Sequence, residues 1–329
     1  MRAKILELLR EKGDFVSGQQ LCDCFGVTRT AVWKAVSRLR EEGYKIEAVQ
    51  NKGYCLVESG AESEMYTQNE LTSRMRTRWA GKPVCFYESL DSTNSEAKRL
   101  AEAGAAHGTL VVADMQTAGK GRRGHSWSCQ AGVNSYFTIL LRPDLMPDAA
   151  PMLTLVMAHA VAAGIRRETG VEVGIKWPND IVIQGRKVCG ILTEMSAERD
   201  YIQHVVIGAG INVRAQEFAP EIADRAIALD TVCDRPTDRS RLLVAIMELF
   251  EEDYEQFVRT GSLASVKDAY QELLVNRGRE VCVLDPAGEY RGVARGINDM
   301  GELLVEMSDG TAREVFAGEV SVRGVYGYV

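Results

Sequence analysis

The chain has 329 residues, of which 46% are hydrophobic and 26% are charged. This composition is typical of globular domains, and the length allows two or three of them, so a fibrous or wholly disordered protein is excluded. No apolar run reaches the roughly 18 residues that a membrane-spanning helix needs, and charges occur throughout the start of the chain, so we expect a cytoplasmic protein without a signal peptide.

Net charge differs along the chain. Residues 1–60 hold 10 Lys and Arg against 8 Asp and Glu, whereas the remainder holds 29 against 38. A nucleic-acid contact is therefore expected in the first part of the chain. The eight cysteines are scattered through apolar stretches and the four histidines are isolated, so we predict reduced thiols and no structural metal.

The first sixty residues predict a helix-turn-helix. Ile5, Leu8 and Leu9 recur at helical spacing, with a stop at Gly13. Ser17 followed by Gln20 matches a capping box for a second helix, which ends near Gly26. A third helix follows, and a turn at residues 50–53 between two short apolar runs predicts a wing hairpin. Residues 1–62 are thus predicted to form a winged helix-turn-helix domain.

The third helix has one apolar face, which leaves Arg29, Thr30, Trp33, Lys34, Ser37 and Arg38 outward or sideways. Residues near its start would contact base edges or phosphates, and a lysine in the wing would contact the DNA backbone. The expected DNA-binding set is Ser17, Arg29, Thr30, Lys34, Ser37 and Lys52. The alternative is a three-helix module that binds another protein.

Residues 59–68 are polar and suggest a linker, and residues 66–273 are predicted to form the main domain. Helical periodicity occurs at 95–105, 149–168 and 240–259, with grouped short strands between these segments. This order favours an α+β domain with a mixed or largely antiparallel sheet.

The most informative stretch is residues 116–127, a glycine-spaced basic loop that ends in Trp127. Its glycines allow backbone N–H groups to face an anion, and its Lys and Arg residues supply positive charge. A dinucleotide-binding motif is disfavoured because a strand-like run, rather than a helix, follows the loop. A Walker loop fails because no glycine-lysine pair precedes Ser or Thr at the required spacing.

Further polar constellations lie in the same domain. Residues 91–94 (DSTN) come between a strand and a helix, and they are either a plain helix cap or a set of groups for a small polar ligand. Residues 176–180 (KWPND) break a strand at Pro178. Residues 187–194 open a second hairpin strand with a lysine and a glycine, and residues 208–213 (GAGINV) place small residues beside one amide.

Residues 276–329 contain short apolar stretches separated by turn signals, with no helical period. This pattern predicts a small all-β barrel.

In their order along the chain, these motifs resemble those of the bacterial biotin protein ligases, specifically the bifunctional type that also represses the biotin operon. The resemblance implies a class II synthetase-like central domain and an SH3-like C-terminal barrel. It further implies activation of biotin with ATP and Mg²⁺ to biotinyl-5′-AMP, and transfer to a lysine of the biotin carboxyl carrier protein of acetyl-CoA carboxylase. The adenylate-bound protein would form a homodimer on operator DNA.

By the same resemblance, Lys187 and Arg122 are expected catalytic residues that approach the carboxylate and the phosphate, and Asp180 is our candidate to orient or deprotonate the carrier lysine. The expected biotin-binding residues are Ser92, Thr93, Asn94, Gln116, Gly119, Lys120, Arg122, Arg123, Gly124, Lys187 and Gly190. The expected adenylate-binding residues are Trp127, Asn179, Asn212, Glu319 and Arg323.

Two positions depart from the family, whose loop commonly carries arginine where this chain has Lys120 and His125. Lysine keeps the charge but loses the forked donor geometry, so we expect altered loop stability rather than lost activity. Two other classes stay open, a lipoate-type protein ligase and a ligand-sensing repressor without catalysis.

Overall fold

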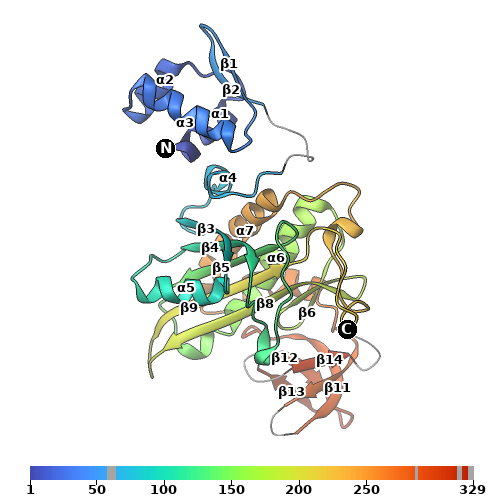
Figure 1. The fold of residues 1–329 in the computed structure, drawn as a ribbon. Coiled ribbons are helices and arrows are strands. Elements are labelled where there is room, and N and C mark those ends of the chain that lie inside the picture. The colour runs from blue at the N-terminus through green and yellow to red at the C-terminus, as the bar shows by residue number, and fades with distance from the viewer. Residues whose placement is uncertain (58–63, 286–287, 317–320, 325–329) are drawn as a thin grey trace. The chain divides into compact units, whose positions relative to one another are not determined.

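The computed structural model describes residues 1–57, 64–285, 288–316 and 321–324 (Figure 1). The chain divides into two compact units, Met1–Arg76 and Thr77–Val329.

The first unit is a helix-turn-helix followed by a hairpin. Its elements are α1 (Arg2–Lys12), α2 (Gly18–Phe25), α3 (Arg29–Glu41), β1 (Ile46–Val49), β2 (Gly53–Leu56) and α4 (Gln68–Arg74). The predicted start of α2 is confirmed, because the Ser17 hydroxyl accepts from the Gln20 N–H while the Gln20 side chain accepts from the Ser17 N–H. The Thr28 hydroxyl caps α3 by accepting from the Ala31 N–H at 3.3 Å, and Gly13 ends α1 with a left-handed backbone conformation.

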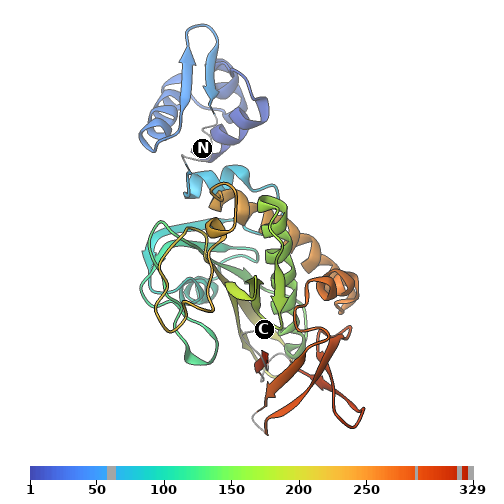
Figure 2. The ribbon, with the colours of Figure 1, turned by 90° about the vertical axis from the view of Figure 1, so that its right-hand side faces the viewer.

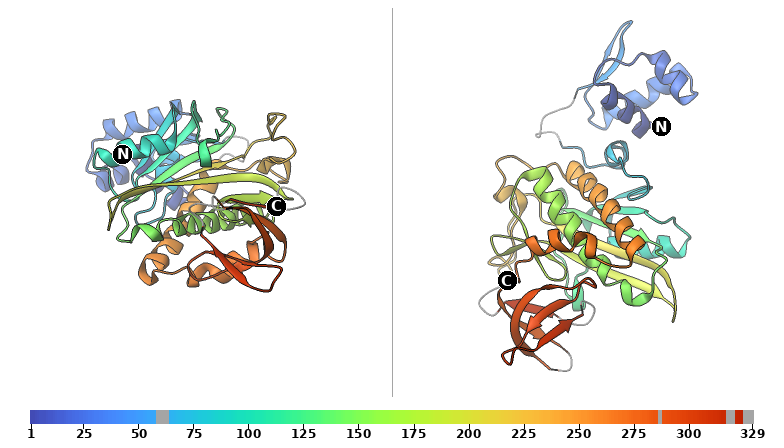
Figure 3. Two further views of the ribbon diagram at one scale, coloured as in Figure 1. Left: turned by 90° about the horizontal axis from the view of Figure 1, so that it is seen from below. Right: turned by 180° about the vertical axis from the view of Figure 1, so that it is seen from behind.

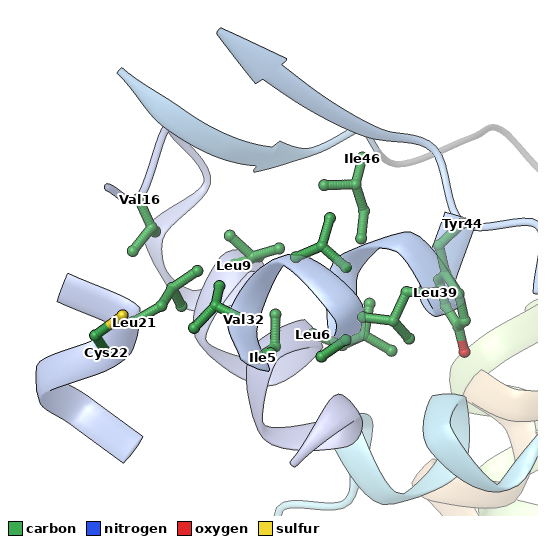
Figure 4. Close-up of a cluster of buried hydrophobic side chains, with 12 residues drawn as sticks. Ile5, Leu6, Leu9, Val16, Leu21, Cys22, Val32, Leu39, Tyr44 and Ile46 are labelled. Atoms are coloured by element: carbon green, nitrogen blue, oxygen red, sulfur yellow. The ribbon is translucent and has the colours of Figure 1, made fainter. Parts of the chain in front are cut away.

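A single apolar core joins these elements. Its side chains come from all three helices and from the start of the wing, and they point toward one another in Figure 4. Ile5, Leu21, Leu39 and Ile46 are each 5% exposed or less, so each helix buries its apolar stripe against the others. This core fixes α3, whose opposite face is exposed.

Helix α4 belongs to the first unit and was not expected from the sequence. The carboxylate of Glu70, on α4, accepts from the Arg10 guanidinium of α1 at 2.6 Å and from Arg74 at 2.5 Å. The Tyr44 hydroxyl lies 3.2 Å from that of Thr67, the residue that caps α4. Polar and ionic contacts therefore help to hold this short helix to the winged helix. Such contacts are not visible in the hydrophobic pattern of the sequence.

The second unit has a central sheet whose strand order is β3-β4-β5-β9-β8-β7-β6. The strands are β3 (Val84–Leu90), β4 (Leu110–Gln116), β5 (Ser135–Leu141), β6 (Gly174–Lys176), β7 (Asp180–Ile183), β8 (Arg186–Ala197) and β9 (Ile202–Ile211). Strands β3 and β4 are parallel, whereas all other neighbouring pairs are antiparallel. The predicted α+β class with a mixed sheet is thus confirmed.

Helices cover both faces of this sheet (Figures 2 and 3). They are α5 (Thr93–Glu102), α6 (Met152–Thr169), α7 (Arg239–Thr260) and α8 (Ala264–Leu273). Helix α5 packs Ala97 and Ala101 on Val111, Leu140 and Val206 of three strands. Helices α6 and α7 lie against each other on the other face, and α8 was not predicted.

Helix α6 is the most apolar element of the described chain. Residues 147–169 are long and apolar enough to cross a membrane, yet 67% of the most apolar window is buried inside the protein. At Gly164 a side chain would meet Ile246 of α7 at 2.7 Å, so the two helices pack at close range. Helix α6 is therefore the core helix of this unit.

The last part of the chain forms an antiparallel sheet with strand order β13-β12-β11-β10-β14. The strands are β10 (Glu280–Leu284), β11 (Tyr290–Ile297), β12 (Leu303–Glu306), β13 (Ala312–Val315) and β14 (Ser321–Gly324). Trp177 connects it to the central sheet, because the indole N–H donates to the Gly301 carbonyl at 3.0 Å and the Trp177 backbone N–H donates to Asn276. The predicted all-β character is confirmed.

Candidate functional site

One cleft of about 440 Å³ gathers most of the motifs found in the sequence. The cleft is bounded by the start of α5, the glycine-rich loop, β8 and β9. The lining residues are Ser92, Thr93, Asn94, Gln116, Lys120, Gly121, Arg122, Trp127, Asn179, Lys187, Gly190, Ile191, Leu192, Gly208, Ala209 and Gly210.

At one end, the first residues of α5 carry polar groups into the cleft. Gln116 at the end of β4 accepts from the Thr93 N–H at 2.7 Å and from the Thr93 hydroxyl at 3.1 Å. Ser92 stands at the N-cap position but makes no capping hydrogen bond with its side chain. The plain helix-cap interpretation of residues 91–94 therefore does not account for Ser92, whose buried hydroxyl lines the cleft.

Asn94 is held more tightly than its neighbours. Its amide donates to the Leu192 carbonyl at 3.2 Å and to the Glu194 carboxylate at 2.8 Å, and its oxygen accepts from the Thr138 hydroxyl. At Gly208 a side chain would stand 2.0 Å from that oxygen. Asn94 thus fixes the start of α5 onto β8 and β5, and Gly208 is required by its close approach.

The floor of the cleft is bare backbone, where Gly190 of β8 pairs with Gly210 of β9. The Trp127 indole lies on this pair, since a methyl group at either glycine would come within 2.7 Å of the ring. Its Nε1 is buried and has no hydrogen-bond partner within the described residues. The Lys187 ammonium lies 5.3 Å from the ring centroid, a cation–π contact.

The glycine-rich loop forms a small hairpin of its own. Lys120 and Ser126 pair as an antiparallel bridge, and the Trp127 N–H donates to the Gly119 carbonyl at 2.9 Å. A side chain at Gly119 would stand 2.7 Å from the Trp127 carbonyl, so the bend needs glycine there. The Lys120 ammonium donates to the Ser95 hydroxyl at 2.9 Å, which ties the loop to α5.

Positive charge collects at the other end of the cleft. The Arg122 guanidinium donates to the Asn179 side-chain oxygen at 3.0 Å, and burial lowers the Arg122 pKa while nearby Asp180 opposes that shift. The Lys187 ammonium lies 2.6 Å from the Asp180 carboxylate. The break at Pro178 therefore places Asn179 and Asp180 where each holds one cation of the cleft.

Some predicted site residues lie outside the lining. The Asn212 amide donates to the Ile227 carbonyl at 3.3 Å, and Arg123 is exposed and reaches the Leu284 carbonyl at 3.5 Å. Gly119 and Gly124 shape the loop. Glu319 falls outside the described residues, as does the side chain of Arg323. The sequence assigned no role to Ala209 and Gly210, although it singled out their stretch as small residues.

On the first unit, Arg29, Thr30 and Lys34 are exposed on α3, and Lys52 is exposed in the wing. Ser37 is half-buried, and the Ser17 hydroxyl is engaged in the capping box. Trp33, which is not among the expected DNA-binding residues, is 60% exposed on the same helix.

Comparison with known proteins gives three family matches. Residues 86–212 match the biotin/lipoate A/B protein ligase family, residues 2–55 an HTH domain and residues 278–323 the biotin protein ligase C terminal domain.

Similar proteins include the bifunctional ligase/repressor BirA of Bacillus subtilis, 37% identical over 98% of both chains. BirA of Escherichia coli is 31% identical over 97% of this chain and 96% of its own. Among solved structures, the biotin protein ligase from Aquifex aeolicus in complex with biotin and ATP matches with a TM-score of 0.66 and 32% identity, covering 74% of this chain and 99% of that one. This chain belongs to the biotin protein ligase family, in the bifunctional ligase/repressor group.

Proposed function

We propose that this protein joins biotin to ATP, forming biotinyl-5′-AMP, and passes the biotin to a specific lysine of the biotin carboxyl carrier protein of acetyl-CoA carboxylase. The observation that carries the proposal is the two-ended cleft, which has neutral hydroxyl and amide groups at α5, cations at Arg122 and Lys187, and a glycine floor between them. An acyl-adenylate needs both kinds of group, namely neutral polar partners for its ring system and cations for its phosphate.

The α5 end holds the biotin ring system in this proposal. Ser92, Thr93 and Gln116 offer short hydroxyl and amide groups that match a neutral polar ligand head. Asn94 and Gly190 keep the backbone in place around it, and Lys120 reaches α5 from the loop. Gly119, Arg123 and Gly124 act through the shape of the loop.

The cationic end stabilises the first half-reaction. The biotin carboxylate attacks the α-phosphorus of ATP, so two anions meet and charge builds on the phosphate oxygens. Lys187 and Arg122 are already fixed by Asp180 and Asn179, which favours charge stabilisation without reorganisation. Mg²⁺ bound to ATP would neutralise the leaving pyrophosphate.

Trp127 provides the surface for the adenine, together with Asn179, Asn212, Glu319 and Arg323. The contact of its ring with the glycine floor supports a stacking role. The glycine-rich loop that carries Trp127 would also exclude water from the mixed anhydride, which water otherwise hydrolyses.

In the second half-reaction the carrier lysine attacks the acyl carbon as a neutral amine, the acyl–phosphate bond breaks and AMP leaves. Asp180 orients that amine or accepts its proton, while its contact with Lys187 also steadies the phosphate clamp. Asp180→Asn should therefore slow transfer more than adenylation when the two steps are timed separately. Equal slowing of both steps would leave Asp180 with the clamp role alone.

The first unit makes the protein a repressor of the biotin operon. Arg29, Thr30 and Lys34 face outward from α3 and match base and phosphate contacts, with Lys52 on the DNA backbone and Ser17 and Ser37 beside them. Adenylate occupancy favours a homodimer that binds a two-fold operator. Operator fragments should be shifted more strongly with biotin and ATP present, and an unchanged shift would contradict ligand-dependent repression.

We further propose three domains, a winged helix at residues 1–62, a class II synthetase-like ligase domain at 66–273 and an SH3-like barrel at 276–329. The start of the second domain differs from the observed division of the chain, because helix α4 packs with the first unit, which ends at Arg76. The strand order and the antiparallel C-terminal sheet support this division. The protein would act in the cytoplasm.

The test of the ligase function is incubation of the full protein with biotin, magnesium-ATP and a carrier domain, followed by mass measurement. The carrier should gain one biotin, and a carrier with arginine at the target position should gain none. An unmodified carrier alongside intact adenylate binding would support a ligand-sensing repressor without catalysis.

A further inference from the structure

A buried amide outside the cleft joins the two segments that flank it. Asn134 lies just before β5 and is 1% exposed. Its oxygen accepts from the Val213 N–H at 3.1 Å and from the Gln216 side-chain amide at 2.7 Å. Its own amide donates to the Tyr136 hydroxyl at 2.9 Å and to the Gln216 side-chain oxygen at 3.3 Å. All four hydrogen-bonding positions of the side chain are thus used.

On one side, these bonds reach the glycine-rich loop. The Tyr136 hydroxyl also accepts from the Gln130 N–H at 3.0 Å, three residues beyond Trp127. Two residues further on, the Gly132 N–H donates to Asp114, whose carboxylate also binds Arg239. Arg239 in turn donates to the Asn134 carbonyl at 3.1 Å. The return of the loop to the sheet is therefore fixed through Asn134 and its neighbours.

On the other side, the bonds reach the segment that follows β9, residues 213–227. Val213 and Gln216 fasten its start to Asn134. Its end is fastened to the phosphate clamp, because the Lys187 N–H donates to the Arg225 carbonyl and the Lys187 carbonyl accepts from the Ile227 N–H at 2.9 Å. The segment thus runs from Asn134 to the backbone of Lys187.

We propose that Asn134, through its paired hydrogen bonds with Gln216, is a positioning residue that couples the glycine-rich loop to segment 213–227. Biotin held under the loop then raises the affinity for the nucleotide at Lys187. The inference rests on the proposed ligase function, since it assigns biotin and nucleotide to the two ends of the cleft. Buried networks of this kind couple their members because a partly satisfied one leaves a polar group without a partner.

The test measures binding of a non-hydrolysable ATP analogue by calorimetry, with and without saturating biotin. The ratio of the two dissociation constants is the coupling factor, and couplings between ligand sites commonly amount to about 5- to 150-fold. Gln216→Ala removes both hydrogen bonds between Asn134 and Gln216 by truncating the half-buried partner. Tyr136→Phe removes the hydroxyl that accepts from the Gln130 N–H of the loop. Either variant should bring the coupling factor close to one while biotin alone still binds.

Gln256→Ala, an exposed glutamine on α7, is the matched control and should keep the full coupling factor. A merely structural role would weaken binding of biotin and of the analogue alike, with an unchanged ratio, and that result would overturn the inference. Wild-type coupling close to one would overturn it as well. Failure of the wild type to bind biotin at all would instead contradict the proposed function.

Discussion

The cleft of the second unit and the exposed face of α3 in the first present their polar groups in opposite ways. In the cleft, Thr93, Arg122 and Lys187 each have a protein partner at 3.1 Å or less. On α3, Lys34 projects into solvent from a helix whose opposite face is buried in an apolar core. The comparison teaches that small changes of shape should damage the cleft, whereas the DNA face should respond to charge.

The largest effect is expected where the cleft depends on one cation. Lys187→Ala removes a fixed charge from the phosphate end and should slow biotinyl-adenylate formation about a hundredfold or more, as loss of one transition-state donor costs roughly 2.7–4 kcal/mol. Single-turnover formation of the adenylate measures this. Arg186→Ala is the matched control, because its side chain leaves the same strand on the other face. Equal rates of adenylate formation in both variants would show that Lys187 does not stabilise the transition state.

A change of shape without charge should come next. Gly210→Ala places a methyl group 2.7 Å from the Trp127 indole and must displace the ring. Overpacking of this kind costs roughly 1–3 kcal/mol of stability. We expect the displaced ring to raise the adenylation barrier by a similar amount, and about 1.4 kcal/mol corresponds to a tenfold lower rate. In contrast, Gly18→Ala in the first unit meets only Tyr54 at 3.9 Å and should leave adenylation unchanged. A fully active Gly210→Ala protein would show that the ring does not need the glycine floor.

On the DNA face, Arg29→Ala should weaken operator binding by about 1–3 kcal/mol and relax the preference for one base pair. Binding isotherms on operator variants measure both quantities. Adenylation by the same protein should be unchanged, because Arg29 belongs to the other unit. An equal loss on every sequence would reassign Arg29 from base to phosphate contact.

The smallest effect is expected for a phosphate contact. Lys34→Ala should lower affinity similarly on all sequences and reduce the salt dependence of binding, the slope of log K against log salt, by about one. Titrations at several salt concentrations would show this. An unchanged slope would mean that Lys34 does not contact DNA.

The sequence predicted the elements that have strong periodicity or caps. The capping box at Ser17, the strand at 135–141 and the order of the α5, α6 and α7 segments agree with the structure. Helix α4 was missed although Thr67 followed by Glu70 matches a helix-cap pattern, and the ionic contact of Glu70 with Arg10, which is distant in the sequence, became visible only in the fold. Hydrophobic patterns do not report such ionic contacts.

In the site, the motif residues could be found from the sequence, whereas their partners could not. Lys187 and Asp180 are close in the sequence, but only the pairing of β7 with β8 shows that they meet. In the sequence, Gly190 and Gly210 are separate small residues. The pairing of β8 with β9 places them side by side as the floor of the cleft. Asn134 gave no signal, because its role comes from segments that meet only in the fold.

The central claim is that this cleft activates biotin, and the most direct measurement is exchange of radiolabelled pyrophosphate into ATP by the full-length protein. Biotin should drive the exchange, lipoate should not, and Lys187→Ala should abolish most of it. Exchange driven equally well by lipoate, or no exchange with biotin while the protein remains folded, would contradict the account.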